Sequence, residues 1–274
     1  MAQHQTPRPD AEPPPSLPWR SDASAWARAG AWWQALRFAA LALATALSPD
    51  AYDREMRRAT ARQIVLSAWP ALPGFLAACA VLSFVLVRIV LDTAHAYGLS
   101  QYALELSVRV LVIELIPLLA VLSVALRSGA AMSAHVALKH VRGDFDAMRA
   151  RGQEPVRHAF APRVFGSVVA VMLLTWLSSA IALAIAYLVS YGFSPWALGP
   201  YLRITGQVFA PVVVTGLGLK TLFFGLAVAT IPISAALSIP RSQRMVPAAV
   251  RTGMVRLGVA LIVIEIGSLI VMYA

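Results

Sequence analysis

The chain has 274 residues, of which 59% are hydrophobic and only 13% are charged, whereas an average soluble domain is about 25% charged. Its mean hydropathy is +0.69 and its apolar residues are gathered in long runs, so a water-soluble globular fold is excluded and lipid is the expected solvent. The formal net charge is +10. The basic residues lie mainly in the hydrophilic stretches between the apolar runs, a distribution that orients a protein in a membrane. Because the sequence has no basic soluble domain, nucleic-acid binding is not expected.

The N-terminal segment, residues 1–22, is predicted to be a disordered cytoplasmic tail. Its first 20 residues contain six prolines and no apolar stretch, a composition that cannot bury a core and that also differs from a cleaved signal peptide. The remaining residues, 23–274, are predicted to form one membrane domain.

An interfacial helix is predicted over residues 23–47. Trp26, Arg28, Trp33 and Arg37 interrupt an otherwise apolar stretch there, and tryptophan and arginine are typical of the headgroup level of a bilayer. We therefore expect an amphipathic helix along the cytoplasmic surface, with a membrane span as the alternative.

Five transmembrane helices follow, so the predicted fold class is an all-α integral membrane protein. Each apolar run is close to the ~20 residues that a bilayer requires. Pro70 and Pro73 predict a kink or break near the start of the first run. The predicted spans cover about residues 64–91, 103–126, 164–187, 208–231 and 257–273.

The longest hydrophilic stretch lies between the second and third spans, over residues 127–163. Its middle part has helical spacing, and Glu154 and Pro155 end that pattern. We expect a folded loop here, whereas the segment YGFSPWALGPYLR after the third span is rich in turn-forming residues.

The distribution of positive charge predicts the orientation. Of the 23 lysines and arginines, 19 lie in the N-terminal part, the central loop with its flanks and the last loop, and the other two loops contain only Arg203. Because translocated loops are poor in Lys and Arg, the N-terminus and central loop are expected to be cytoplasmic and the C-terminus to lie outside.

Ionisable residues inside the predicted spans are the strongest candidates for function, since each costs at least ~2.5 kcal/mol at the bilayer centre if it faces lipid. Glu105 and Arg109 are one turn apart and are expected to form a structural pair. Glu114 and Lys220 lie deeper, on different spans, and two readings are open for them: an inter-span ion pair, or a polar spot in a lipid-holding cavity.

Catalytic chemistry finds no support in the sequence. Cys79 is the one cysteine, which rules out an intrachain disulfide and a thiolate metal cluster. The histidines show no metal-ligand spacing, the TGLGLKT segment around Lys220 lacks the spacing of a phosphate-binding loop, and no nucleophile is paired with a base. We therefore expect no enzyme activity, and energy must come from a partner or an ion gradient.

The second span and the central loop resemble the MlaE (YrbE-like) permease family of lipid-transporting ABC systems. VIELIPLLAVLSVALRSGAAMSAHVALKHV resembles the family stretch built on an E-L-x-P core, an arginine followed by a small residue and glycine, and a short helix. FDAMRARGQEPVRHAFAPRVF continues the similarity through a methionine, an E-P turn and a closing P-R. The flanking stretches ARQIVLSAW and GLKTLFFGLAVATIP resemble the family's first-span entrance and lysine-containing fourth span.

The resemblance implies a permease subunit of an ABC transporter in the bacterial inner membrane. Two copies of the chain would form the membrane core, with a cytoplasmic ATPase pair on one side and a periplasmic MCE-domain protein on the other. ATP and magnesium would belong to the ATPase, so no cofactor is expected in this chain. The cargo would be phospholipid or a related lipid.

Site residues also follow from the resemblance. Glu114, Lys220 and Glu265 match positions where family members carry charges in or near the translocation cavity, and Arg62 matches an arginine at the cytoplasmic end of the first span. The segment from about Ala137 to Ala150 would be the coupling helix that docks in the ATPase. Its candidate docking residues are Lys139, Arg142, Asp144 and Asp146.

Two departures from the family pattern change these expectations. The family often has an arginine directly before the E-L-x-P glutamate, where this chain has Ile113, and we expect Arg109, one turn earlier, to supply that positive charge to the cavity. RGDFDAM replaces an acidic T-E-Q-like pattern in the coupling helix, which leaves Asp144 and Asp146 as its acidic residues.

The sequence thus favours the membrane subunit of an ATP-driven lipid transporter. Two rival classes remain: an ion-coupled secondary transporter or channel that uses the buried carboxylates as proton or cation sites, and a membrane scaffold whose buried charges only hold helices together. The absence of inverted repeats argues against the first rival. An ATPase that copurifies with the chain would separate the favoured class from both.

Overall fold

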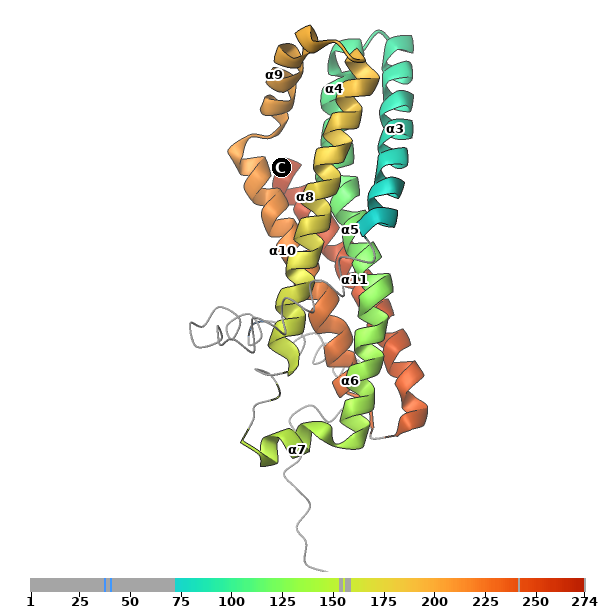
Figure 1. Ribbon diagram of the computed structural model, residues 1–274, viewed down its shortest axis with the longest axis vertical. Helices are drawn as coiled ribbons and strands as arrows, with labels where there is room; N and C mark the ends of the chain where they lie inside the picture. The colour runs from blue at the N-terminus through green and yellow to red at the C-terminus, as the bar shows by residue number, and fades with distance from the viewer. Residues whose placement is uncertain are drawn as a thin grey trace, which may run out of the picture.

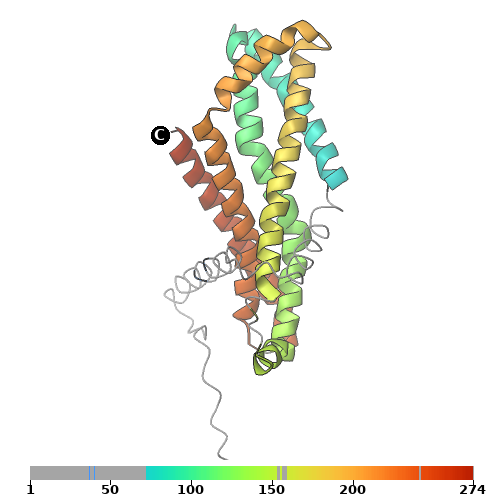
Figure 2. The same ribbon diagram turned by 60° about the vertical axis from the view of Figure 1, so that its left-hand side comes forward.

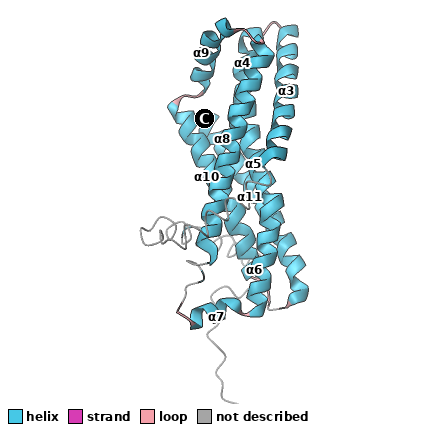
Figure 3. Cartoon of the chain, in the orientation of Figure 1, coloured by secondary structure: helices cyan, strands magenta, loops and turns pink. Residues whose placement is uncertain are grey.

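The computed structural model describes residues 72–152, 159–240 and 242–273, together with Arg37, Ala40 and Pro155. All regular elements in this part of the chain are helices (Figure 3). The predicted tail, Arg62, the first residues of the first span and almost all of the predicted interfacial helix lie outside the described residues.

Five described helical stretches are long and apolar enough to cross a bilayer, as the hydropathy pattern predicts. They stand roughly side by side in an elongated bundle (Figure 1). Their bounds are Leu72–Ala96, Tyr102–Arg142, Ala161–Tyr191, Pro211–Leu237 and Gln243–Met272.

The first three spans are built from α3 to α8. The second span is one continuous rod in which two π-helical segments, η2 and η3, interrupt the α-helix. Pro73 lies within α3, and Pro70 lies outside the described residues, so the kink predicted near the start of the first span stays a prediction. The elements are α3 (Leu72–Ala96), α4 (Ser100–Val108), η2 (Arg109–Leu115), α5 (Ile116–Val124), η3 (Ala125–Gly129), α6 (Ala130–Arg142), α7 (Asp144–Ala150) and α8 (Ala161–Tyr191).

The last two spans and their connections are built from η5 to α11. α10 and α11 run side by side in both ribbon views (Figures 1 and 2). The elements are η5 (Pro195–Ala197), α9 (Leu198–Val208), α10 (Pro211–Leu237), η6 (Gln243–Met245) and α11 (Val246–Tyr273).

The second span is longer than the sequence pattern suggests. Its 41 residues extend over ~60 Å at 1.5 Å per residue, about twice the hydrocarbon thickness of a bilayer. The extra length is α6, whose last turn contains Lys139, His140 and Arg142. The second span therefore carries α6 out of the hydrocarbon and holds its basic end away from the apolar region.

The coupling segment differs from the single helix expected over about 137–150. Gly143 has a φ of 78°, a left-handed conformation that ends α6 and turns the chain. The short helix α7 then lies across the end of the bundle (Figure 1), with Phe145 buried and packed on Phe160 at a centroid distance of 5.2 Å. The expected helix is therefore two helices joined at a glycine.

Two further differences concern the final helix and the segment between the third and fourth spans. The final helix begins at Val246 and not near residue 257, because Arg251 and Arg256 are tolerated in its first turns. α9 was expected to be turns, since Gly199 and Pro200 stand near its start. The helix is held by a buried face that includes Tyr201, whose hydroxyl donates a hydrogen bond to the Leu183 carbonyl at 2.7 Å.

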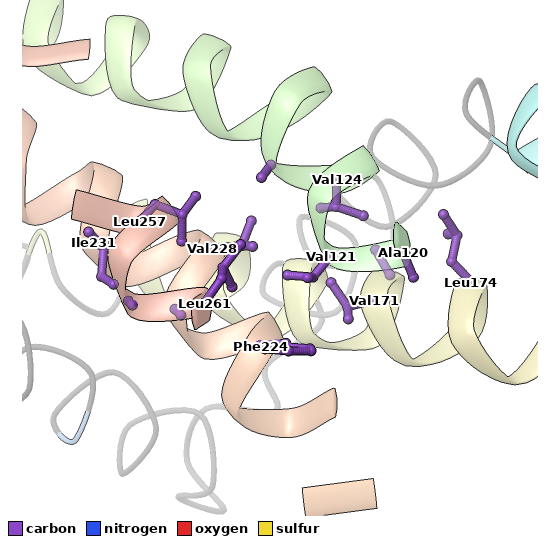
Figure 4. Packing of buried hydrophobic residues seen from close by; sticks show 14 residues of the cluster. Ala120, Val121, Val124, Val171, Leu174, Phe224, Val228, Ile231, Leu257 and Leu261 are labelled. Atoms are coloured by element: carbon purple, nitrogen blue, oxygen red, sulfur yellow. The ribbon is translucent and has the colours of Figure 1, made fainter. Parts of the chain in front are cut away.

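The buried apolar residues of the described chain form three clusters, one of which lies where α10 packs against α8, α11 and α5. Ten apolar side chains of this cluster are labelled in Figure 4, among them Val171 of α8, Phe224 and Val228 of α10, and Leu257 of α11. α8 and α10 approach closely at Gly225, where an added Cβ would lie 2.5 Å from the Cα of Val168. A side chain at this position would therefore meet backbone, which does not move aside easily.

The connections separate to the two ends of the bundle. The α3–α4 and α8–α9 connections lie at one end, and α7 lies with the α10–α11 connection at the other (Figures 1 and 2). The two basic connections of the described part therefore share one end, as the charge distribution predicts.

Candidate functional site

Three ionisable side chains from three different spans meet inside the bundle. Glu114 belongs to η2, Lys220 to α10 and Glu265 to α11. The Lys220 Nζ lies 2.5 Å from Glu114 Oε2 and 2.9 Å from Glu265 Oε1. The Lys220 side chain is 1% exposed, and the two glutamate side chains are 15% and 16% exposed. We call these three residues the charged triad.

The charged triad explains how ionised groups are tolerated in the spans. A lone ammonium or carboxylate in the bundle interior is strongly disfavoured, and an opposite charge with good hydrogen-bond geometry offsets most of that cost. The Phe224 ring adds a weaker contact, with its centroid 6.0 Å from the Lys220 Nζ. The sequence left two interpretations open for Glu114 and Lys220, and one of them was an ion pair between spans. The structure contains this pair, and Glu265 forms a second ion pair with Lys220.

A backbone carbonyl completes the coordination of Lys220. Its Nζ donates to the Ile113 carbonyl at 3.3 Å. Pro117 stands four residues after Ile113 and has no N–H, so it cannot make the α-helical bond to that oxygen. The π-helical η2 precedes the proline and widens the helix where the ring has to fit. The E-L-x-P stretch thus provides both a carboxylate and a free carbonyl for the lysine.

Sequence reasoning identified the charges of this site but not the part played by its backbone. The spacing of Ile113 and Pro117 was visible in the sequence and predicts a free carbonyl. Which side chain would meet that carbonyl depends on the packing of α10 against the second span, which no local pattern reveals.

Arg109 is outside the charged triad. Its Nη2 lies 3.1 Å from Glu105 Oε1 on the same helix, and the two side chains are 35% and 39% exposed. This is the structural pair expected from their spacing. The role proposed for Arg109 in a cavity stays a prediction.

The residues expected to dock the ATPase lie at the α7 end of the bundle. Lys139 and Arg142 are on α6, and Asp144 and Asp146 are on α7, so the turn at Gly143 divides them between two helices. Asp146 Oδ1 lies 3.5 Å from Arg149 Nη1. Their docking role stays a prediction.

The charged triad offers an ion-pair and hydrogen-bond network, in which Lys220 donates to both carboxylates. In the described part of the chain, His, Cys, Asp and Glu side chains form no group of three that would hold a metal ion. Apolar residues surround the charged triad along the chain. On α11, for example, the exposed residues Ile262 and Ile266 lie on either side of Glu265 in the sequence.

Known proteins resemble this chain over much of its length. The family described as Permease MlaE matches residues 60–270. A probable ABC transporter permease protein of Rickettsia prowazekii (strain Madrid E) is 30% identical over 140 residues, and one of Rickettsia conorii (strain ATCC VR-613 / Malish 7) is 30% identical over the same length. Each alignment covers 49% of this chain and 54% of the relative, so the chain spans about half the length of the curated relatives it matches.

The family match covers the charged triad and all the described helices except the last residues of α11. Permeases are membrane transport components and not enzymes, in agreement with the sequence. Because the match extends over more than half of the chain, this protein belongs to the MlaE permease family.

Proposed function

We propose that the chain is the membrane subunit of an ABC transporter that moves phospholipid or a related lipid between the inner membrane and a periplasmic MCE-domain protein. The family match over residues 60–270 carries the proposal. The Rickettsia relatives are named as probable ABC transporter permeases, which supports an ATP-driven mechanism. ATP and magnesium would be bound by a separate ATPase.

The surroundings of the charged triad suit a lipid. An amphipathic cargo needs an apolar surface for its acyl chains and a few polar groups for its headgroup. Exposed apolar side chains cover much of α11 around Glu265, including Ile262, Val263 and Ile266. An exposed apolar surface in a membrane protein contacts lipid or another protein chain. In the proposed transporter, two copies of this chain pair and the lipid passes between them, so this face of α11 contacts both the second copy and the lipid.

The orientation follows from the basic connections. The end of the bundle that carries α7 and the α10–α11 connection contains Lys139, Arg142, Arg149 and Arg244. The opposite end contains Arg203 of α9. We place the α7 end in the cytoplasm, because positive residues are retained on that side.

The coupling surface is tested by charge reversal at the α7 end. Asp144→Lys should lower the amount of ATPase that copurifies with the chain by about tenfold, because a repulsive charge at a docking surface costs on the order of 1–2 kcal/mol. The matched control is Arg203→Glu, a charge reversal at the other end of the bundle. Equal ATPase recovery with both variants would contradict the proposed docking site, and the absence of any ATPase with the wild-type chain would contradict the ABC mechanism.

The role of the E-L-x-P proline is tested by Pro117→Ala. A proline inside a helix costs about 3 kcal/mol, so the variant should fold at least as stably as the wild type. Its new N–H competes with Lys220 for the Ile113 carbonyl, and ATP-dependent lipid transfer should fall several-fold as the charged triad loses its geometry. Transfer is measured between proteoliposomes and acceptor vesicles.

Pro232→Ala is the control for that measurement. Pro232 is also inside a helix, α10, but its own carbonyl accepts a hydrogen bond from Ser133 at 3.2 Å and no ionisable side chain is involved. Lipid transfer should be unchanged in this variant. Equal transfer by both alanine variants would show that the proline does not position the triad.

A further inference from the structure

The end of the bundle opposite α7 is rich in aromatic residues and poor in charged ones. The α3–α4 and α8–α9 connections lie together at this end (Figures 1 and 2). Residues 93–104 and 187–202, which contain these connections, include no Asp, Glu, Lys or Arg, and seven of these 28 residues are Phe, Trp or Tyr. Loops that project into water are normally polar. This end therefore lacks the composition of a water-exposed surface.

Four aromatic side chains at this end are exposed. Phe193 and Trp196 of the α8–α9 connection are each 92% exposed, and no large hydrophobic residue in the described part of the chain is more exposed than these two. Tyr97 and Tyr102, at the α3–α4 connection, are 77% and 56% exposed. A group of exposed large apolar side chains marks a surface that contacts lipid or another protein.

The backbone of the α8–α9 connection is held in place from inside the bundle. Gly192 follows α8 with a φ of 62°, a conformation that favours glycine. The Tyr187 hydroxyl donates a hydrogen bond to the Ser194 carbonyl. The Tyr187 ring also packs near edge-on against Tyr201 of α9, with the ring centroids 5.2 Å apart. The connection is thus fixed to both neighbouring helices, while its two most exposed aromatic side chains lie outside the packed bundle.

The length of α8 places this connection at the level of the lipid headgroups. α8 has 31 residues, or ~46 Å at 1.5 Å per residue, and a bilayer with its headgroups is about 40–45 Å thick. α8 begins beside α7, where Phe160 packs on Phe145. Its other end therefore reaches the opposite headgroup layer and does not extend far beyond it.

From the composition, exposure and level of this connection, we propose that Phe193 and Trp196 are a membrane anchor, seated in the headgroup layer of the outer leaflet. An indole has an apolar ring and one N–H donor, which suits the boundary between acyl chains and headgroups. An anchor on a fixed backbone sets the depth and tilt of α8 in the bilayer. A periplasmic protein seated on the same side chains is the alternative, but the rim of a protein interface is polar, and charged residues are lacking here. The anchor does not depend on which lipid the chain transports.

Depth-dependent quenching of tryptophan fluorescence tests the anchor. The transporter complex is reconstituted in vesicles whose phospholipids carry bromine either near the carboxyl end of the acyl chain or near its middle, and acrylamide is the quencher in water. The signal of Trp196 is the difference between the wild type and Trp196→Phe. Bromine near the carboxyl end should quench this signal more strongly than bromine in the middle of the chain, so that the ratio of the two is above one. Acrylamide should quench it less than it quenches free tryptophan.

Trp176 is the matched control on the same helix. It is 43% exposed and lies 15 residues before the end of α8, ~22 Å along the axis, which places it near the bilayer centre. The difference between the wild type and Trp176→Phe should show the opposite order, with a quenching ratio below one. Phe193→Trp, compared with the wild type, adds a fluorophore to the same connection and gives the depth if Trp196→Phe does not fold.

Three results would overturn the anchor. Strong quenching of Trp196 by acrylamide, without quenching by either brominated lipid, would place the connection in water. Resistance to all three quenchers would mean that a partner protein or a second copy of the chain covers it. The order found for Trp176 would place it in the hydrocarbon. None of these results changes the rate of lipid transfer, which is measured separately, so the proposed function would stand or fall independently.

Discussion

Lys220→Met should destabilise the protein by about 3–5 kcal/mol, the cost of leaving buried carboxylates without their cation. The expected effect is large because Lys220 is 1% exposed and neutralises charge from two other spans. The variant removes the contacts that tie α10 to η2 and to α11. Thermal unfolding of the purified protein in one detergent should show a clearly lower midpoint.

Two comparisons make this result specific. Arg88→Met removes one partner of a surface pair with Asp92, whose side chains are 62% and 63% exposed, and should have little effect, because exposed pairs contribute little. The triple variant Lys220→Met, Glu114→Gln, Glu265→Gln should recover most of the lost stability, since replacing a whole buried ionic cluster by neutral groups is often neutral or stabilising. A triple variant as unstable as Lys220→Met would show that volume, and not charge, explains the loss.

Gly225→Ala should be destabilising by about 1–3 kcal/mol, the usual cost of overpacking a tight contact, and Gly225→Val should be worse. The new Cβ would lie 2.5 Å from the Cα of Val168, so α8 and α10 would have to separate. That separation disturbs the packing of Val171 and Phe224 in the core shown in Figure 4. The same thermal unfolding assay measures the effect.

Gly218→Ala is the control for this contact. Gly218 lies on the same helix, and no atom lies within 4 Å of the Cβ it would gain. Alanine is a better helix former than glycine by about 1 kcal/mol, so Gly218→Ala should be neutral or stabilising. If both alanine variants shifted the unfolding midpoint in the same direction, the close crossing at Gly225 would not be a determinant of stability.

The spans themselves were predictable from the sequence because the constraint that creates them is simple. A segment inside lipid must be apolar and long, so hydropathy locates it without knowledge of its neighbours. The same constraint made Glu114, Lys220 and Glu265 conspicuous, since ions at that depth need a partner. The identity of that partner was only partly predictable, and Glu265 was added by the packing of α11 on α10.

Local features that depend on packing were harder to predict. α9 contains a glycine and a proline near its start, yet the burial of Tyr201 and Thr205 stabilises it as a helix. The break at Gly143 was visible as a residue type, but any glycine can also stand inside a helix, and only the structure shows its left-handed conformation. The role of Pro117 likewise required the position of Lys220.

The central claim is that the charged triad serves the passage of lipid and does not merely hold three helices together. ATP-dependent lipid transfer by the triple variant Lys220→Met, Glu114→Gln, Glu265→Gln, reconstituted with its ATPase, tests this claim most directly, because the variant is expected to stay folded. We predict a decrease in the transfer rate of at least about tenfold, equivalent to ~1.4 kcal/mol, with the ATPase still bound. Transfer at the wild-type rate would contradict the claim and leave the triad a structural ion cluster.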